Sequence, residues 1–162
     1  PHSELRNSMH LSLVGLGKKF DREWIFRDLT LDAPPGQPLA VTGPNGSGKS
    51  TLLQVICGQM PASEGTISYG LSGKSVEPDA VFRHLTFAAP YLELIEEFTL
   101  AELVRFHGRF KAFRRRLSPQ DLIDLLELTS ARDKSIRHFS SGMKQRVKLG
   151  LALYSEATLV LL

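Results

Sequence analysis

The sequence contains little cysteine and no long apolar run. Cys57 is the only cysteine among 162 residues, so no disulfide can form within the chain, and a reducing cytosol is its natural setting. The longest apolar runs, such as 158–162, are far too short to cross a bilayer. Residues 1–8 are polar and lack the apolar stretch of a signal peptide. We therefore expect a cytoplasmic protein.

The charge and the composition are also moderate. The formal net charge is +3, which by itself does not imply a nucleic-acid partner. Hydrophobic residues make up 42% and charged residues 23% of the chain, close to the averages of globular proteins, which argues against disorder. A chain of this length can bury a real core as one domain or most of one.

The most informative segment is 43–51, which reads Gly-Pro-Asn-Gly-Ser-Gly-Lys-Ser-Thr. It fits the phosphate-loop template G-x-x-x-x-G-K-[ST] at every fixed position. Glycines let the backbone turn sharply and present N–H groups to phosphate oxygens, and the following helix directs its positive end at the same phosphates. Lys49 supplies a mobile charge for the outer phosphates, and Ser50 or Thr51 offers Mg²⁺ a hydroxyl. The alternative, a plain glycine-rich strand-to-helix turn, is disfavoured because chance rarely matches all four fixed positions.

Around this loop, alternating and short apolar segments predict strands. The predicted strands are Leu11–Leu16, Trp24–Phe26, Leu29–Leu31, Leu39–Val41, Thr66–Tyr69, Leu85–Ala88 and a buried strand Thr158–Leu162. Leu39–Val41 is expected to lead into the phosphate loop, and a helix over Ser50–Ile56 is expected to follow it.

Helices are predicted mainly in the second half. Thr99 with Glu102 forms a capping-box pattern, and Ser118 precedes a proline at the first helical position. The apolar set of that second helix is Leu122, Leu125 and Leu126, with Ile123 beside it. A third helix is expected over Ser141–Tyr154. Strands that alternate with helices around a phosphate loop indicate an α/β fold.

A second informative segment, 139–146, lies about a hundred residues after the loop. Alone it reads as a helix N-cap with basic residues on a solvated face. After a phosphate loop, however, it resembles the signature of ABC-type ATPases, Leu-Ser-Gly-Gly-Gln followed by basic-Gln-Arg. The matching residues are Phe139, Ser140, Gly142, Lys144, Gln145 and Arg146, and the departures are Ser141 and Met143.

This resemblance covers nearly the whole chain. It implies a phosphate-loop NTPase core of ABC type, with an N-terminal antiparallel β portion and a helical subdomain over roughly 91–140. Residues 1–162 would then form about the first two-thirds of a single nucleotide-binding domain, incomplete at its C-terminus.

The resemblance also implies a site for ATP and Mg²⁺. Phe20 falls where the family places an aromatic that stacks on adenine, although core packing explains it equally well. Lys49 and Ser140 would act in catalysis, and Ser50 would hold Mg²⁺. Ser140 and Gly142 would contact the γ-phosphate bound to another subunit. The remaining expected binding residues are Gly43, Asn45, Gly46, Ser47, Gly48 and Thr51.

The partners implied by the resemblance are a second ATP-binding subunit and an integral membrane transporter subunit. The protein would then be peripheral on the membrane, held there by the transporter subunit. No nucleic-acid partner is expected. Hydrolysis would drive alternating access in the membrane subunit.

Two departures from the family pattern bear on the chemistry. The family's glutamine after the strand at 85–88 is replaced here by Ala89 or Pro90, and Glu93, Glu96 and Glu97 stay open as substitutes. The Asp-Glu pair that the family places directly after the strand at 158–162 does not occur within residues 1–162. We therefore expect these residues alone to bind nucleotide and to hydrolyse it poorly.

The segment 103–120 holds six basic residues and no acidic one, including Arg114, Arg115 and Arg116. Three interpretations compete: a solvated face, contact with an anionic membrane or acidic partner loop, and, least favoured, nucleic-acid binding. The five histidines are scattered singly, without metal-ligand spacing.

Two other functions compete with transport. One is a soluble ABC-type ATPase of translation or DNA maintenance, which would copurify with ribosomes or DNA instead of a membrane protein. The other is a nucleotide-binding module that does not hydrolyse, and it would lack the Asp-Glu pair.

Overall fold

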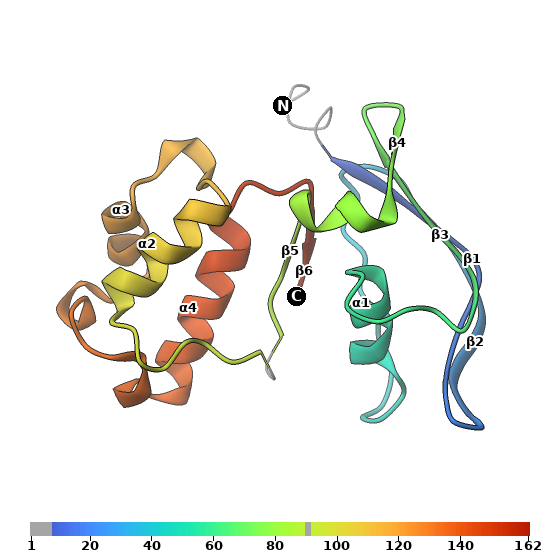
Figure 1. The fold of residues 1–162 in the computed structure, drawn as a ribbon, viewed down its shortest axis with the longest axis horizontal. Coiled ribbons are helices and arrows are strands. Elements are labelled where there is room, and N and C mark those ends of the chain that lie inside the picture. The colour runs from blue at the N-terminus through green and yellow to red at the C-terminus, as the bar shows by residue number, and fades with distance from the viewer. Residues whose placement is uncertain (1–7, 90–91) are drawn as a thin grey trace. The chain divides into compact units, whose positions relative to one another are not determined.

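The computed structural model describes residues 8–89 and 92–162 and divides into two compact units, the first through Leu85 and the second from Thr86 (Figure 1). Within the described residues, no helix has the length and apolar character needed to cross a membrane.

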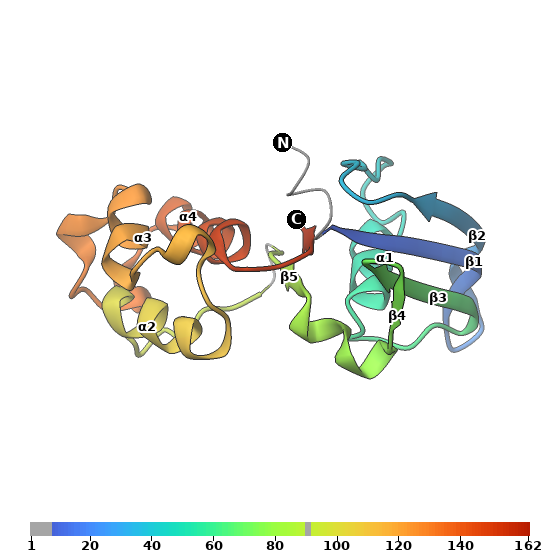
Figure 2. The ribbon, with the colours of Figure 1, turned by 90° about the horizontal axis from the view of Figure 1, so that it is seen from above.

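The first unit is an antiparallel sheet with one helix against a face of it (Figures 1 and 2). The sheet has the order β2-β1-β3-β4. Its strands are β1 (Met9–Phe20), β2 (Glu23–Ala33), β3 (Glu64–Leu71) and β4 (Lys74–Val76). Helix α1 (Lys49–Ile56) buries Leu52, Val55 and Ile56, and the Tyr69 hydroxyl of β3 donates a 2.6 Å hydrogen bond to the Ile56 carbonyl. This hydrogen bond joins the end of the helix to the sheet.

The predicted strands at 11–16 and 66–69 are confirmed and are longer than expected. The prediction of two short strands at 24–26 and 29–31 is wrong, because both belong to β2. The ladder advances two residues on β1, from Leu16 to Lys18, while it advances three on β2, from Leu29 to Phe26. This bulge absorbs an extra residue next to Asp28, whose φ is 52°, so the strand bends without ending.

The predicted strand Leu39–Val41 is also wrong. Neither sheet includes residues 37–44, and Leu39 and Val41 are 54% and 44% exposed. A strand requires a neighbour that completes its backbone hydrogen bonds. Neither sheet of the described chain provides one at this segment, so its apolar sequence alone does not make it a strand.

The second unit is mainly helical. It contains α2 (Leu100–Phe110), α3 (Pro119–Leu125) and α4 (Ser141–Tyr154), together with β6 (Leu159–Leu161), which pairs with β5 (Leu85–Phe87). The predicted capping box at Thr99 with Glu102 forms. The predicted cap at Ser118 also forms, and the structure adds a capping box there with Asp121, which the sequence analysis did not predict. The predicted bounds of α4 are confirmed at both ends.

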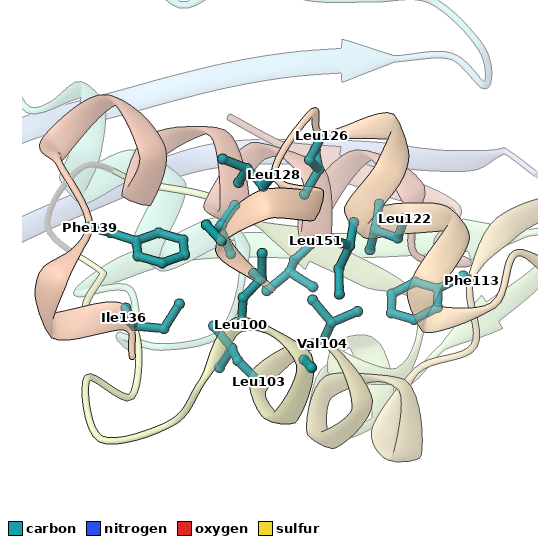
Figure 3. Close-up of a cluster of buried hydrophobic side chains, with 14 residues drawn as sticks. Leu100, Leu103, Val104, Phe113, Leu122, Leu126, Leu128, Ile136, Phe139 and Leu151 are labelled. Atoms are coloured by element: carbon teal, nitrogen blue, oxygen red, sulfur yellow. The ribbon is translucent and has the colours of Figure 1, made fainter. Parts of the chain in front are cut away.

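The side chains of α2, α3 and α4 meet in one buried cluster (Figure 3). Leu100, Val104, Leu122 and Ile136 in this cluster are fully buried. The predicted apolar face of α3 needs correction, because Ile123 is 1% exposed whereas Leu125 is 51% exposed. The buried face thus consists of Leu122, Ile123 and Leu126, with Ile123 in place of the predicted Leu125.

The strand at the end of the chain is only partly buried. Leu161 is 8% exposed, but Leu162 is 58% exposed and lies outside β6. The predicted buried strand over 158–162 is therefore confirmed as a strand at Leu159–Leu161, but its burial is wrong except at Leu161, since β6 has a ladder with β5 alone.

Candidate nucleotide-binding site

The phosphate loop turns on glycines with positive φ. Gly43, Gly46 and Gly48 have φ of 152°, 82° and 87°, a region that residues with a Cβ rarely adopt. Gly48 is the N-cap of α1, and a Cβ there would lie 2.6 Å from Cγ2 of Ile25 on β2. A Cβ at Gly46 would meet nothing within 4 Å, so that position opens to solvent. Packing against β2 therefore requires a glycine at position 48, whereas the space next to Gly46 is open.

Lys49 folds back across the loop that precedes it. Its Nζ donates hydrogen bonds of 2.9 Å to the Gly43 carbonyl and 2.8 Å to the Pro44 carbonyl. The Ser47 N–H closes the turn with a 3.2 Å bond to the Pro44 oxygen. The ammonium thus lies over the loop, held by two neutral carbonyl oxygens that an anion can replace.

The other predicted residues of the loop follow directly. Asn45 and Ser47 are exposed in the turn, while Ser50 and Thr51 lie in the first turn of α1. The hydroxyl-bearing side chain of Ser50 is exposed. These residues and the glycines are consecutive in the chain at the start of α1, where the helix dipole is positive.

Phe20 lies at the end of β1, in the same unit as the phosphate loop. The ring is 44% exposed, so the core-packing interpretation is wrong. The Nζ of Lys18 lies over the ring, 5.1 Å from its centroid. Sequence reasoning missed this contact, although two residues at i and i+2 of a strand point to the same face.

In the second unit, the signature segment forms the start of α4. Ser140 is the N-cap, and its Oγ accepts a 3.2 Å hydrogen bond from the Met143 N–H. A Cβ at Gly142 would find only the Ser140 oxygen, at 4.0 Å, so the space beside this glycine is open. Ser140 and Gly142 are both exposed. The helix start therefore presents a hydroxyl and free N–H groups to solvent.

A short segment braces this helix start. Glu96 accepts a hydrogen bond from Lys144 in α4, and this bond, followed by the charge of Lys144, lowers the pKa of the Glu96 carboxyl. The Glu96 carbonyl also accepts bonds from Ser135 Oγ, at 2.7 Å, and from the Arg137 N–H, at 3.1 Å. Glu96 thus connects Ser135 and Arg137, which precede the signature, to Lys144 in α4.

The three glutamates that the sequence analysis considered as substitutes for the family's glutamine have different surroundings. Glu96 is bound to Lys144, and Glu97 lies 3.8 Å from Arg137, while Glu93 is exposed. Ala89 is buried at 5% exposure, and Pro90 lies outside the described residues.

The basic segment 103–120 has mixed roles. Arg114 donates to the carbonyls of Ser155 and Ala157, at 2.9 and 2.7 Å, and so satisfies the backbone beyond the end of α4. Burial lowers the pKa of Lys111. Arg115 and Arg116 are exposed and both have φ of 56°. The run is therefore partly structural, and a solvated face describes only its exposed members.

Comparisons with known proteins identify the family of the chain. The family model described as ABC transporter matches residues 26–162. The sulfate/thiosulfate import ATP-binding protein CysA 2 of Rhizobium meliloti (strain 1021) is 32% identical, over 95% of this chain and 44% of its own length. The corresponding CysA protein of Escherichia coli (strain K12) is 30% identical over the same shares of the two chains.

Solved structures give the same result. A structure of an ATP-binding subunit of an ABC transporter is 29% identical, with a TM-score of 0.74 over 88% of this chain and 61% of that one. A nucleotide-free ATP-binding cassette from an ABC transporter, at 21% identity and a TM-score of 0.64, shares the fold over 90% of this chain and 64% of its own.

The chain belongs to the ABC transporter family of ATP-binding proteins, and its α/β fold of ABC type is confirmed. It spans less than half the length of the curated relatives it matches, 44% in the case of the Rhizobium protein.

Proposed function

We propose that the protein binds MgATP at the phosphate loop and that the complete protein hydrolyses it to power transport by a membrane partner. The observation that carries this proposal is the loop itself, in which Lys49 lies over positive-φ glycines at the start of α1. The family supports the ATP-binding part.

The residues present fit a nucleotide's phosphates. The open space above Gly46 leaves the loop backbone accessible, and the two carbonyls that accept from the ammonium of Lys49 can be exchanged for phosphate oxygens. Ser50 is exposed in the first turn of α1, which suits a hydroxyl ligand of Mg²⁺. When bound, Mg²⁺ supplies charge that stabilises the transferred phosphoryl group.

Within this proposed site, the residues of the phosphate loop and Phe20 have separate roles. Lys49 leaves the Gly43 and Pro44 carbonyls and neutralises charge on the outer phosphates. The loop N–H groups and the start of α1 orient the phosphates. Phe20, exposed at the end of β1, offers one ring face to the adenine base.

The signature supports a shared site between two copies. Ser140 and Gly142 are exposed at the N-terminus of α4, where a hydroxyl and helix-start N–H groups favour an anion. We propose that they contact the γ-phosphate held by the phosphate loop of a second ATP-binding subunit. Nucleotide would then join two subunits, and hydrolysis would release them.

The proposal of a membrane partner rests on the relatives. The CysA proteins are named as ATP-binding proteins of sulfate or thiosulfate import. A partner that spans the membrane would place this protein at the cytoplasmic membrane surface.

The test is steady-state ATP hydrolysis by the full-length protein. Lys49→Ala removes the charge over the loop, and we expect the rate to fall by about a hundredfold or to background, as for loss of a group that stabilises transition-state charge. Lys74→Ala, at an exposed lysine of β4, removes the same charge elsewhere in the first unit and is expected to leave the rate unchanged. Equal rates for the two variants would contradict a catalytic phosphate loop.

A further inference from the structure

The end of β1 carries two neighbouring lysines with different surroundings. Lys18 is buried, at 8% exposure, whereas Lys19 is exposed. Because successive side chains of a strand point to opposite faces, Lys18 shares a face with Phe20, and Lys19 lies on the other. The contacts agree: Lys18 Nζ lies 5.1 Å from the Phe20 centroid, and Lys19 Nζ lies 5.4 Å from the centroid of Trp24.

The ammonium of Lys18 is fixed in place. It donates a 2.8 Å hydrogen bond to the Pro61 carbonyl, in the segment that follows α1. That segment is bound to β1 on both sides of Lys18, because the Ser63 N–H donates to the Gly17 carbonyl at 2.8 Å and Ser63 Oγ accepts from the Lys19 N–H at 3.1 Å. The long, flexible side chain of Lys18 is thereby held at one position over the Phe20 ring.

We propose that Lys18 is a positioning residue for the nucleotide base: it holds the Phe20 ring by a cation–π contact and strengthens stacking of a purine on the ring's exposed face. The proposal rests on the proposed function, since it deepens the role of Phe20 in that site.

The electrostatics of the ring explain the effect. The faces of an aromatic ring are negative, so two stacked π systems repel through their faces. A cation on one face draws electron density toward itself and reduces that repulsion on the other face. The fixed ammonium also restricts the ring before the base arrives, which lowers the ordering cost of binding. Phe20 is 44% exposed, so it retains surface for the base.

The experiment measures the affinity of the full-length protein for the non-hydrolysable ATP analogue AMP-PNP with Mg²⁺, by calorimetry. Lys18→Met keeps the apolar stem and removes the charge. We expect its Kd to rise about fivefold, which is about 1 kcal/mol at 1.4 kcal/mol per factor of ten. In a Phe20→Leu background, where no π face remains, the same change is expected to have no further effect.

Two controls separate this role from a structural one. Lys19→Met makes the same substitution one residue away, over Trp24, and is expected to leave the affinity unchanged. Inorganic tripolyphosphate with Mg²⁺ has phosphates but no base, and its affinity is expected to be the same for Lys18→Met and the unmodified protein. If Lys18→Met does not fold, Lys18→Gln removes the charge and retains a donor for the Pro61 carbonyl.

The outcomes are distinct. An unchanged AMP-PNP affinity in Lys18→Met overturns the inference, and so does an equal loss in the Phe20→Leu background or with tripolyphosphate. If the unmodified protein binds neither AMP-PNP nor tripolyphosphate, the proposed function itself is overturned. Binding of both ligands, with no effect of Lys18, would leave the proposed function standing and remove only the inference.

Discussion

At the scale of single residues, Gly48 is subject to two constraints, a positive φ and close packing against β2, whereas the phosphate-loop pattern shows only that a glycine is required. Its φ is 87°, and a Cβ would lie 2.6 Å from Ile25 Cγ2. Gly46 has a similar φ, 82°, but open space around it. A comparison of Gly46 with Gly48 thus separates the free-energy cost of the backbone conformation from the cost of packing against β2.

We expect Gly48→Ala to lower the free energy of unfolding more than Gly46→Ala does. The left-handed backbone costs each variant about 1 kcal/mol, and the contact with Ile25 adds about 1–3 kcal/mol at Gly48 alone, as for overpacking. Chemical denaturation of both variants measures the difference. Equal destabilisation would show that β2 yields to the added methyl group without cost.

His107 provides a pH-dependent contribution to stability in the second unit. Its Nε2 lies 2.7 Å from Ser155 Oγ, and since that hydroxyl donates to the Leu151 carbonyl at 2.6 Å, the imidazole N–H donates to it. Burial, and to a lesser degree the charge of Lys111, lowers the pKa of His107. Protonation is therefore less favourable in the folded state than in the unfolded one.

The direction of the pH dependence follows. Because the folded pKa lies below the unfolded value of about 6.5, the unfolded state binds more protons at acid pH. The contribution of His107 is full above pH 6.5 and is lost as the pH falls through the folded pKa. In thermal unfolding between pH 7.5 and 5, His107→Gln is expected to lose less stability than the unmodified protein. The control His138→Gln, at an exposed position, is expected to follow the unmodified protein, and a match between His107→Gln and His138→Gln would contradict this account.

At the scale of elements, the start of α4 depends on a contact from outside the helix. Lys144 binds Glu96, whose carbonyl accepts from Ser135 and Arg137. The segment before α2 and the signature therefore hold each other. Because these side chains are partly exposed, salt should weaken the contact.

We expect Glu96→Gln to speed backbone amide hydrogen exchange in residues 140–146, because the charge that fixes Lys144 is lost. High salt should produce a similar change in the unmodified protein. The matched control is Glu97→Gln, since Glu97 lies 3.8 Å from Arg137 and its side chain is 73% exposed. If Glu96→Gln and Glu97→Gln exchange alike, Lys144 does not stabilise the helix start through Glu96.

The elements that local sequence defines were predictable. The capping residues Thr99 and Ser118 and the bounds of α4 follow from interactions between near neighbours, and all are confirmed. The strand at 39–41 was not predictable, because a strand depends on a partner that is distant in sequence. The same reason explains why two strands were expected where β2 is continuous, since its bulge is defined by the register with β1.

The site divides in the same way. The phosphate loop and the cap at Ser140 are continuous segments, so their residues could be found in the sequence. The exposure of Phe20 and its contact with Lys18 depend on how β1 is completed by residues 61–63, which no local pattern reveals. The relation between Lys144 and Glu96 spans 48 residues and was likewise beyond sequence reasoning.

At the scale of the whole molecule, binding and turnover should be separable. A polypeptide limited to residues 1–162 contains the phosphate loop and the signature, and it excludes the position after residue 162 where resemblance to the family places the Asp-Glu pair. We expect it to bind nucleotide and to hydrolyse ATP slowly, at a rate that does not respond to Lys49→Ala. Sustained turnover that Lys49→Ala abolishes would show that another group of these residues activates the water.

The central claim is that the phosphate loop binds nucleotide through Lys49. The most direct test is calorimetric titration of the full-length protein with AMP-PNP and Mg²⁺, with Lys49→Ala and the control Lys74→Ala alongside. The account predicts that Lys49→Ala weakens binding by about tenfold or more, or about 1.4 kcal/mol, while Lys74→Ala binds like the unmodified protein. Equal affinity in all three folded proteins, or no binding by the unmodified protein, would contradict it.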